Sequence, residues 1–117
     1  MSSNTIEDLL DKITLEFNKP ILFNQRKREM ISKVIHELPE EIQRIASNFK
    51  VNGMDNIVTS ENDFLLGTVN SFIYYKVLHY CSLLGNPLQT AELPILQTCL
   101  FANSSKLMDL IIKISGK

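Results

Sequence analysis

Residues 60–85 read SENDFLLGTVNSFIYYKVLHYCSLLG, and this stretch decides the fold. Ser60 is a favourable N-cap residue, and the carboxylate of Asp63 suits the positive end of the helix dipole. Gly85 is a typical helix stop, and the Asn-Pro pair that follows it cannot continue a helix. The stretch therefore predicts one helix over about residues 61–84, roughly 36 Å long at 1.5 Å per residue.

The apolar side chains of this predicted helix cover roughly two thirds of its circumference at 100° per residue. They are Leu65, Leu66, Val69, Phe72, Ile73, Tyr74, Val77, Leu78, Tyr80, Cys81, Leu83 and Leu84. A helix with such a wide apolar surface belongs inside a bundle, so we expect a long, largely buried central helix. The remaining strip is polar and consists of Thr68, Ser71, Tyr75, His79 and Ser82.

Shorter segments on both sides carry single apolar stripes at helical spacing, with recognisable start and stop residues. We expect helices over about residues 5–17, 25–37, 39–51 and 93–102, and a last one capped by residues 103–105 that stops at Gly116. Ile57 and Val58 would suit a short strand, but the sequence offers no partner strand. We therefore predict one all-α domain over residues 1–117, a compact bundle of five to six helices around the central one.

Composition excludes several classes of protein. The chain of 117 residues is 44% apolar and 21% charged, with a net charge of −1, which argues against a basic nucleic-acid binder and an electrostatic membrane anchor. Its uninterrupted apolar runs are too short for a membrane span, and its start, MSSNTIEDLLDKI, lacks the features of a secretion signal. We expect a cytoplasmic protein in which Cys81 and Cys99 are small buried hydrophobic residues, and a disulfide between the two stays possible.

The sequence gives no metal or cofactor motif. His79 and Cys81 are a local pair with metal-ligand chemistry, but two residues apart on a helix they point about 200° away from each other. His36 is isolated in the sequence. We therefore expect neither a metal site nor a cofactor.

Nucleophilic catalysis would need a nucleophile, a base and an orienting group. Ser71 and His79 share a helix face but are about 12 Å apart along the axis, too far for a hydrogen bond. Tyr75 and Ser82 are close enough to His79, as in any helix with a polar strip. We expect no catalytic activity, and a small enzyme with a site near His79 is the second alternative.

The two helices on either side of Pro39 invite comparison with a helix-turn-helix. The junction has this proline instead of the usual glycine, and the would-be recognition helix opens with two glutamates, which would repel phosphates. Arg26, Lys27 and Arg28 lie on the preceding helix, where they could contact phosphates only. We do not expect nucleic acid as the partner, and a helix-turn-helix-like regulator is the first alternative.

The remaining class is a protein-binding module, and two surfaces are candidates. One is the polar strip, because tyrosines favour interfaces, although the strip is equally typical of a solvent edge. The other is the apolar run 21–23 beside the basic turn 25–28, which is also typical of a plug beneath the bundle and a solvated charge run. The candidate partner-binding residues are Tyr75, His79, Ser71, Phe23, Arg26, Lys27 and Arg28. The partner is another protein, with a homodimer as a further option, and an inhibitor, an immunity-type neutraliser, a chaperone and a regulatory adaptor all fit.

Overall fold

The computed structural model describes residues 3–18, 23–51, 53 and 60–116. Six α-helices and one 3-10 turn make up the regular structure of these residues, and no strand occurs among them. The helices are α1 (Ser3–Asn18), α2 (Gln25–His36), α3 (Leu38–Val51), α4 (Glu61–Leu83), α5 (Leu93–Ala102) and α6 (Ser104–Ser115), with the turn η2 (Thr90–Glu92) before α5. The all-α bundle that the sequence predicts is confirmed. The segment with Ile57 and Val58 lies outside the described residues.

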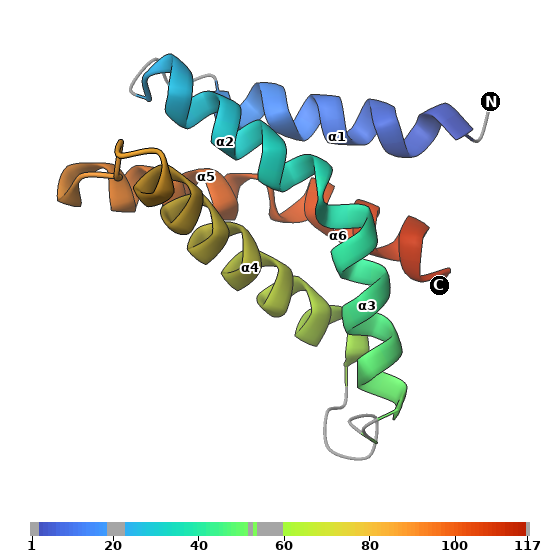
Figure 1. Cartoon of the computed structure of the whole chain (residues 1–117). Coiled ribbons are helices and arrows are strands. Elements are labelled where there is room, and N and C mark those ends of the chain that lie inside the picture. The colour runs from blue at the N-terminus through green and yellow to red at the C-terminus, as the bar shows by residue number, and fades with distance from the viewer. Residues whose placement is uncertain (1–2, 19–22, 52, 54–59, 117) are drawn as a thin grey trace.

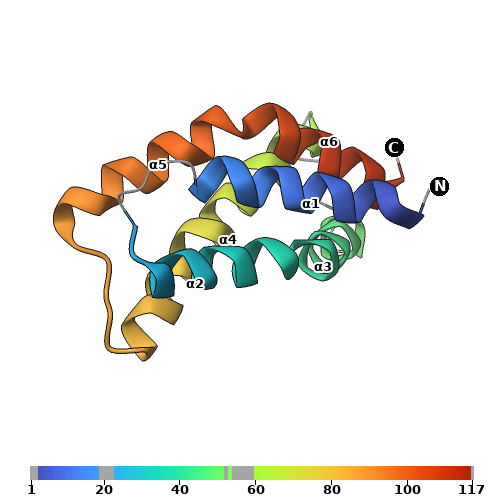
Figure 2. The same ribbon diagram turned by 90° about the horizontal axis from the view of Figure 1, so that it is seen from above.

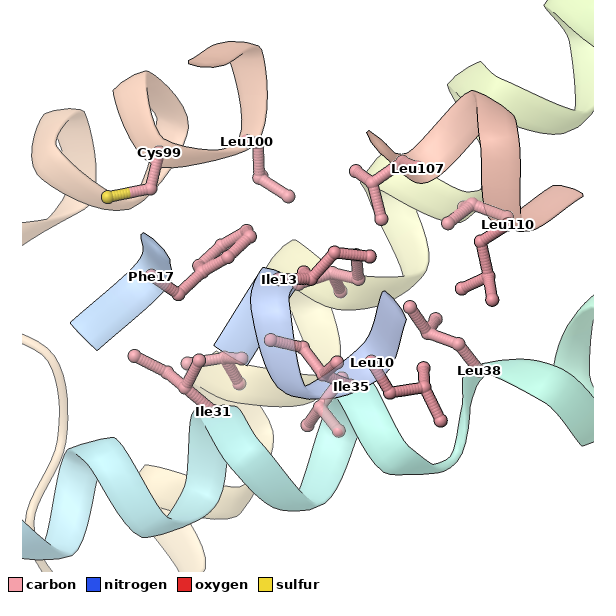
Figure 3. Packing of buried hydrophobic residues seen from close by; sticks show 14 of the residues in the cluster. Leu10, Ile13, Phe17, Ile31, Ile35, Leu38, Cys99, Leu100, Leu107 and Leu110 are labelled. Carbon is pink, nitrogen blue, oxygen red and sulfur yellow. The ribbon is translucent and has the colours of Figure 1, made fainter. Parts of the chain in front are cut away.

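The helices enclose one core (Figures 1 and 2). α1 and α4 lie on opposite sides of it in Figure 1, while α2 and the pair α5–α6 close the other two sides. Ile13 and Phe17 of α1 point into the space between Ile31 and Ile35 of α2 and Leu107 of α6 (Figure 3). All five side chains are fully buried, and each such burial contributes about 1.5–3 kcal/mol relative to exposure.

The ends of the helices follow local capping chemistry. The Ser60 side chain accepts a hydrogen bond from the backbone N–H of Asp63 at 3.3 Å, as the sequence predicts. The side chain of Asn24 caps α2 in the same way, accepting from the N–H of residue 27 at 3.0 Å. Gly85 and Gly116 have φ values of +70° and +79°, which favour glycine and end α4 and α6.

α4 is the longest helix and contacts α2, α3, α5 and α6, so it is the central helix that the sequence predicts. Its fully buried positions, however, form one stripe with a spacing of four: Leu65, Val69, Ile73, Val77 and Cys81. Most other apolar side chains of α4 are half-buried, and Leu83 and Leu84 at its end are exposed. The central helix is therefore buried along one stripe and half-buried beside it, while the predicted polar strip at Ser71, Tyr75 and His79 is exposed.

α2 and α3 form an elbow with a single residue, Glu37, between them. The N–H of Glu37 still donates to carbonyls of α2, and the carbonyl of Glu37 accepts from the N–H of Glu41 at 3.3 Å. The backbone hydrogen bonds are therefore nearly continuous from α2 to α3. Pro39 has no N–H to donate and bends the chain here, one residue inside the start of α3. A helix-turn-helix has a turn of three to four residues, and this junction does not contain one.

Cys81 and Cys99 are buried, as the sequence predicts, and both are free, so the disulfide that the sequence left possible is not formed. Burial raises the pKa of both thiols, so they are poor nucleophiles. None of the described helices has both the length and the apolar character that crossing a bilayer requires.

Candidate partner-binding groove

An open groove of about 510 Å³ lies between α3 and α4. Its α3 wall consists of Glu41, Arg44 and Ile45, and its α4 wall of Thr68, Ser71, Phe72, Tyr75, Lys76 and His79. Three of the predicted partner-binding residues, those at 71, 75 and 79, therefore line the same concave surface. The sequence identified the α4 wall as a strip but gave no sign of the α3 wall opposite it.

The groove exists because α3 and α4 pack at one end only. The rings of Phe49 and Phe64 are 5.3 Å apart near the start of α4, and the two helices diverge from there toward the elbow (Figure 1). The α4 wall residues are spaced by three, one, three, one and three positions, so they form one helical face beside the buried stripe. No described helix covers this face.

Tyr75 is the most prominent aromatic side chain of the groove. It is 67% exposed and stands edge-on to the ring of Tyr74, with 5.1 Å between ring centroids. Half-buried Phe72 and buried Ile45 lie deeper in the groove. On its other side Tyr75 borders a second depression of about 250 Å³ that reaches Gln97 of α5. An exposed tyrosine on a ridge between two depressions is a typical interface anchor.

Charged side chains form the rim where the groove continues to the elbow as a depression of about 500 Å³. The rim residues are Glu37, Glu40, Glu41, Arg44 and Lys76. Arg44 forms an ion pair with Glu41, one turn away on α3. The Lys76 ammonium lies 5.8 Å from the ring centroid of Phe72 and 5.4 Å from that of Tyr80, so both rings have a cation beside them.

Tyr80 fixes α4 to the elbow and with it the width of the groove. Its hydroxyl donates to the Glu37 carboxylate, with both oxygens at 2.9 Å, and the Lys33 ammonium lies 5.1 Å from its ring centroid. Desolvation, then the hydrogen bond and charge of Glu37, raise the pKa of Tyr80. The sequence places Tyr80 among the apolar residues of the helix and contains no signal that would reveal this contact.

His79 lies exposed at one end of the groove, with its ring 6.2 Å from that of Tyr80. Within the described part of the chain no hydrogen bond joins it to Ser71, Tyr75 or Ser82. No nucleophile–base pair is therefore formed here, and the imidazole is available to a bound partner.

The second predicted surface is the apolar run 21–23 beside the basic turn 25–28, and only part of its described residues is exposed to solvent. Phe23 is 1% exposed, so it is a buried plug and cannot be a docking knob for a partner. Lys27 is 5% exposed, and Arg28 donates through Nε to the carbonyl of Phe23 at 2.9 Å. Arg26 remains exposed. Residues 21 and 22 of the run lie outside the described residues.

Lys27 is buried because it pairs with Glu92, sixty-five residues later in the chain. Its Nζ lies 2.7 Å from Oε1 of Glu92, and beside it the amides of Asn24 and Asn86 bond to each other at 3.0 and 3.3 Å. The N-terminus of α2 is thus attached to the connection between α4 and α5. A cation in the first turn of a helix is unfavourable for the helix dipole. The ion pair with Glu92 explains why Lys27 nevertheless occupies the first turn of α2.

The sequence-based view of His36 as isolated was wrong. Its Nε2 lies 3.5 Å from Oδ1 of Asp11, and ligand atoms of Glu7, Asp11 and His36 all lie within 4.8 Å of one another. All three residues are exposed. Among the described residues this is the one group of three side chains that could hold a metal ion.

An apolar, aromatic centre with a charged rim is the usual composition of a protein-binding surface. Comparison of the chain with protein-family models, curated proteins and solved structures gave no match. A functional assignment therefore depends on the residues of the groove themselves.

Proposed function

We propose that this protein works in the cytoplasm by binding another protein in the groove between α3 and α4, without catalysing a reaction. The observation that carries the proposal is Tyr75, 67% exposed beside half-buried Phe72 on an uncovered helix face. Leaving large aromatic surface in water is unfavourable, and a partner that covers it gains the free energy of that burial.

The partner segment that suits this groove is an amphipathic helix. The α4 wall extends from Thr68 to His79, eleven positions or roughly 17 Å, which corresponds to about three helical turns. A partner helix of that length would place apolar residues at i, i+4 and i+7 against Phe72, Tyr75 and Ile45. With the partner helix in the groove, α3, α4 and the partner would form a packed group of three helices.

The charged rim supports selectivity for one partner. Glu40 and Glu41 stand at the elbow end on α3, while Lys76 lies on α4 and His79 stands at the end of its wall. A partner with complementary charges would associate faster, and one with like charges would be rejected. An inhibitor, a neutraliser of the immunity type, a chaperone and a regulatory adaptor all use a surface of this kind.

A photo-crosslinking amino acid at position 75 tests the proposal in the cells that produce the protein. We expect a discrete protein adduct of defined mass from position 75, and none from position 15, because Leu15 on α1 is equally exposed at 68% but lies outside the groove. Adducts with nucleic acid alone, or equal adducts from both positions, would contradict the proposal.

Once the adduct identifies the partner, its affinity measures the contribution of the groove. The double variant Tyr75→Ala, His79→Ala should keep the helical circular dichroism and thermal midpoint of the wild type, since both side chains are exposed. It should bind the partner about tenfold or more weakly, as for a tyrosine at the centre of an interface. Leu15→Ala is the matched control, and equal affinities for the two variants would refute the assignment.

A further inference from the structure

A cluster of metal-ligating side chains joins α1 to α2, away from the partner-binding groove. Glu7 and Asp11 lie one turn apart on the same face of α1. His36 is the last residue of α2, and its Nε2 lies 3.5 Å from Oδ1 of Asp11. Their ligand atoms lie within 4.8 Å of one another, so two consecutive helices bring two carboxylates and one imidazole together.

The imidazole is already oriented by a group outside the cluster. Nδ1 of His36 lies 2.8 Å from the backbone carbonyl oxygen of Ser32. A carbonyl oxygen only accepts hydrogen bonds, so Nδ1 carries the hydrogen, and in the neutral imidazole the lone pair is on Nε2, which faces Asp11. A histidine whose other nitrogen donates to a backbone carbonyl is the usual arrangement of a metal ligand.

A cation could lie between His36 and Asp11 at this position. With its hydrogen on Nδ1, the Nε2 lone pair would stand 3.5 Å from a carboxylate oxygen, and two electron-rich groups would face each other. A divalent cation between them turns this repulsion into coordination. The geometry of the cluster is therefore compatible with a bound cation.

The distances are close to those of a zinc site. Bonds of 2.0–2.1 Å in a tetrahedron separate the ligand atoms by about 3.3 Å. The 3.5 Å between His36 and Asp11 already meets this, and Glu7 has at most about 1.5 Å to move, which a rotamer change of an exposed side chain supplies.

We propose that Glu7, Asp11 and His36 bind Zn²⁺ or a similar first-row transition dication, with water completing the coordination sphere. Mixed nitrogen and carboxylate ligands suit zinc, whereas Mg²⁺ prefers oxygen ligands and keeps its water. The bound ion would connect α1 to α2 and stabilise the folded chain, because an unfolded chain does not hold the three ligands together.

Calorimetric titration of the untagged full chain with ZnCl₂ tests this. We expect saturable binding of one ion per chain, a thermal midpoint that rises with zinc concentration, and no competition from excess Mg²⁺. His36→Gln should weaken binding about tenfold or more while leaving the metal-free midpoint unchanged. His79→Gln is the matched control, because it removes the other histidine of the chain, and it should bind zinc like the wild type.

Cobalt(II) absorption then identifies the ligands. Nitrogen and oxygen ligation gives visible d–d bands without the intense near-ultraviolet band of thiolate ligation. Absence of saturable binding, equal affinity in His36→Gln and wild type, or a thiolate band from Cys81 or Cys99 would each overturn the proposal. In the first case the cluster is a contact between His36 and Asp11 that holds no ion.

Discussion

The buried ion pair between Lys27 and Glu92 gives a prediction about stability. The Lys27 ammonium is almost completely buried, and the same Glu92 oxygen that it contacts also accepts the N–H of Gln89 at 2.8 Å. Glu92→Ala removes the counter-charge and this turn-stabilising bond together. Lys27→Met keeps most of the apolar volume of the side chain and removes only the charge.

The loss in the free energy of unfolding for each variant depends on which charged group of the pair stays buried without its partner. Removing one partner of a fully buried pair costs about 3–5 kcal/mol. The Glu92 side chain is 13% exposed, so water can partly replace it, and we expect Glu92→Ala to cost about 2–3 kcal/mol. Lys27→Met should cost about 1–2 kcal/mol, because the carboxylate keeps its bond to Gln89. The double variant should cost less than the sum by about 1 kcal/mol or more.

Urea unfolding followed by circular dichroism measures these free energies, since the chain has no tryptophan. Partial burial alone would raise the pKa of Glu92, but the bonds from Gln89 and Lys27 and the charge of Lys27 outweigh it, and the pKa is lowered. A lowered carboxyl pKa means that the stabilisation is complete above the unfolded value of about 4.3 and is lost as the pH falls through the folded value. The difference between wild type and Glu92→Ala should therefore shrink below about pH 4.3. Additive single-variant costs, or a difference that does not change with pH, would refute the reasoning.

The remaining predictions concern α4. Val77→Asp should unfold the domain, since Val77 is fully buried and an unpaired carboxylate there costs several kcal/mol; a cooperative thermal transition near that of the wild type would contradict this. The same substitution at Phe72, which the sequence view treats as equivalent, should be tolerated better because Phe72 borders the open groove. Gly67→Ala should stabilise by about 0.5–1 kcal/mol, since Gly67 lies within the helix with open space around it. Gly85→Ala should destabilise by about 1 kcal/mol, because the φ of Gly85 is +70°. Urea unfolding should therefore give changes in unfolding free energy of opposite sign for the two glycine variants.

Half of the candidate groove could be predicted from the sequence. The spacing of Ser71, Tyr75 and His79 places them on one helix face, and periodicity is a property of the helix itself. The opposite wall from Ile45 and Arg44 could not be predicted, because it depends on how α3 packs against α4. The same limit explains why Phe23 and Lys27 were wrongly placed on a surface.

By itself the sequence determined the all-α class and the helix ends. Asn24, Ser60, Gly85 and Gly116 set these ends through hydrogen bonds and backbone angles within one turn, so residues nearby in the chain are sufficient. Only the tertiary structure decided which face of α4 is covered, that Lys27 meets the distant Glu92, and that His36 joins the carboxylates of α1. Such contacts depend on how the helices pack together, and a local pattern does not specify the partner of a side chain more than a turn away.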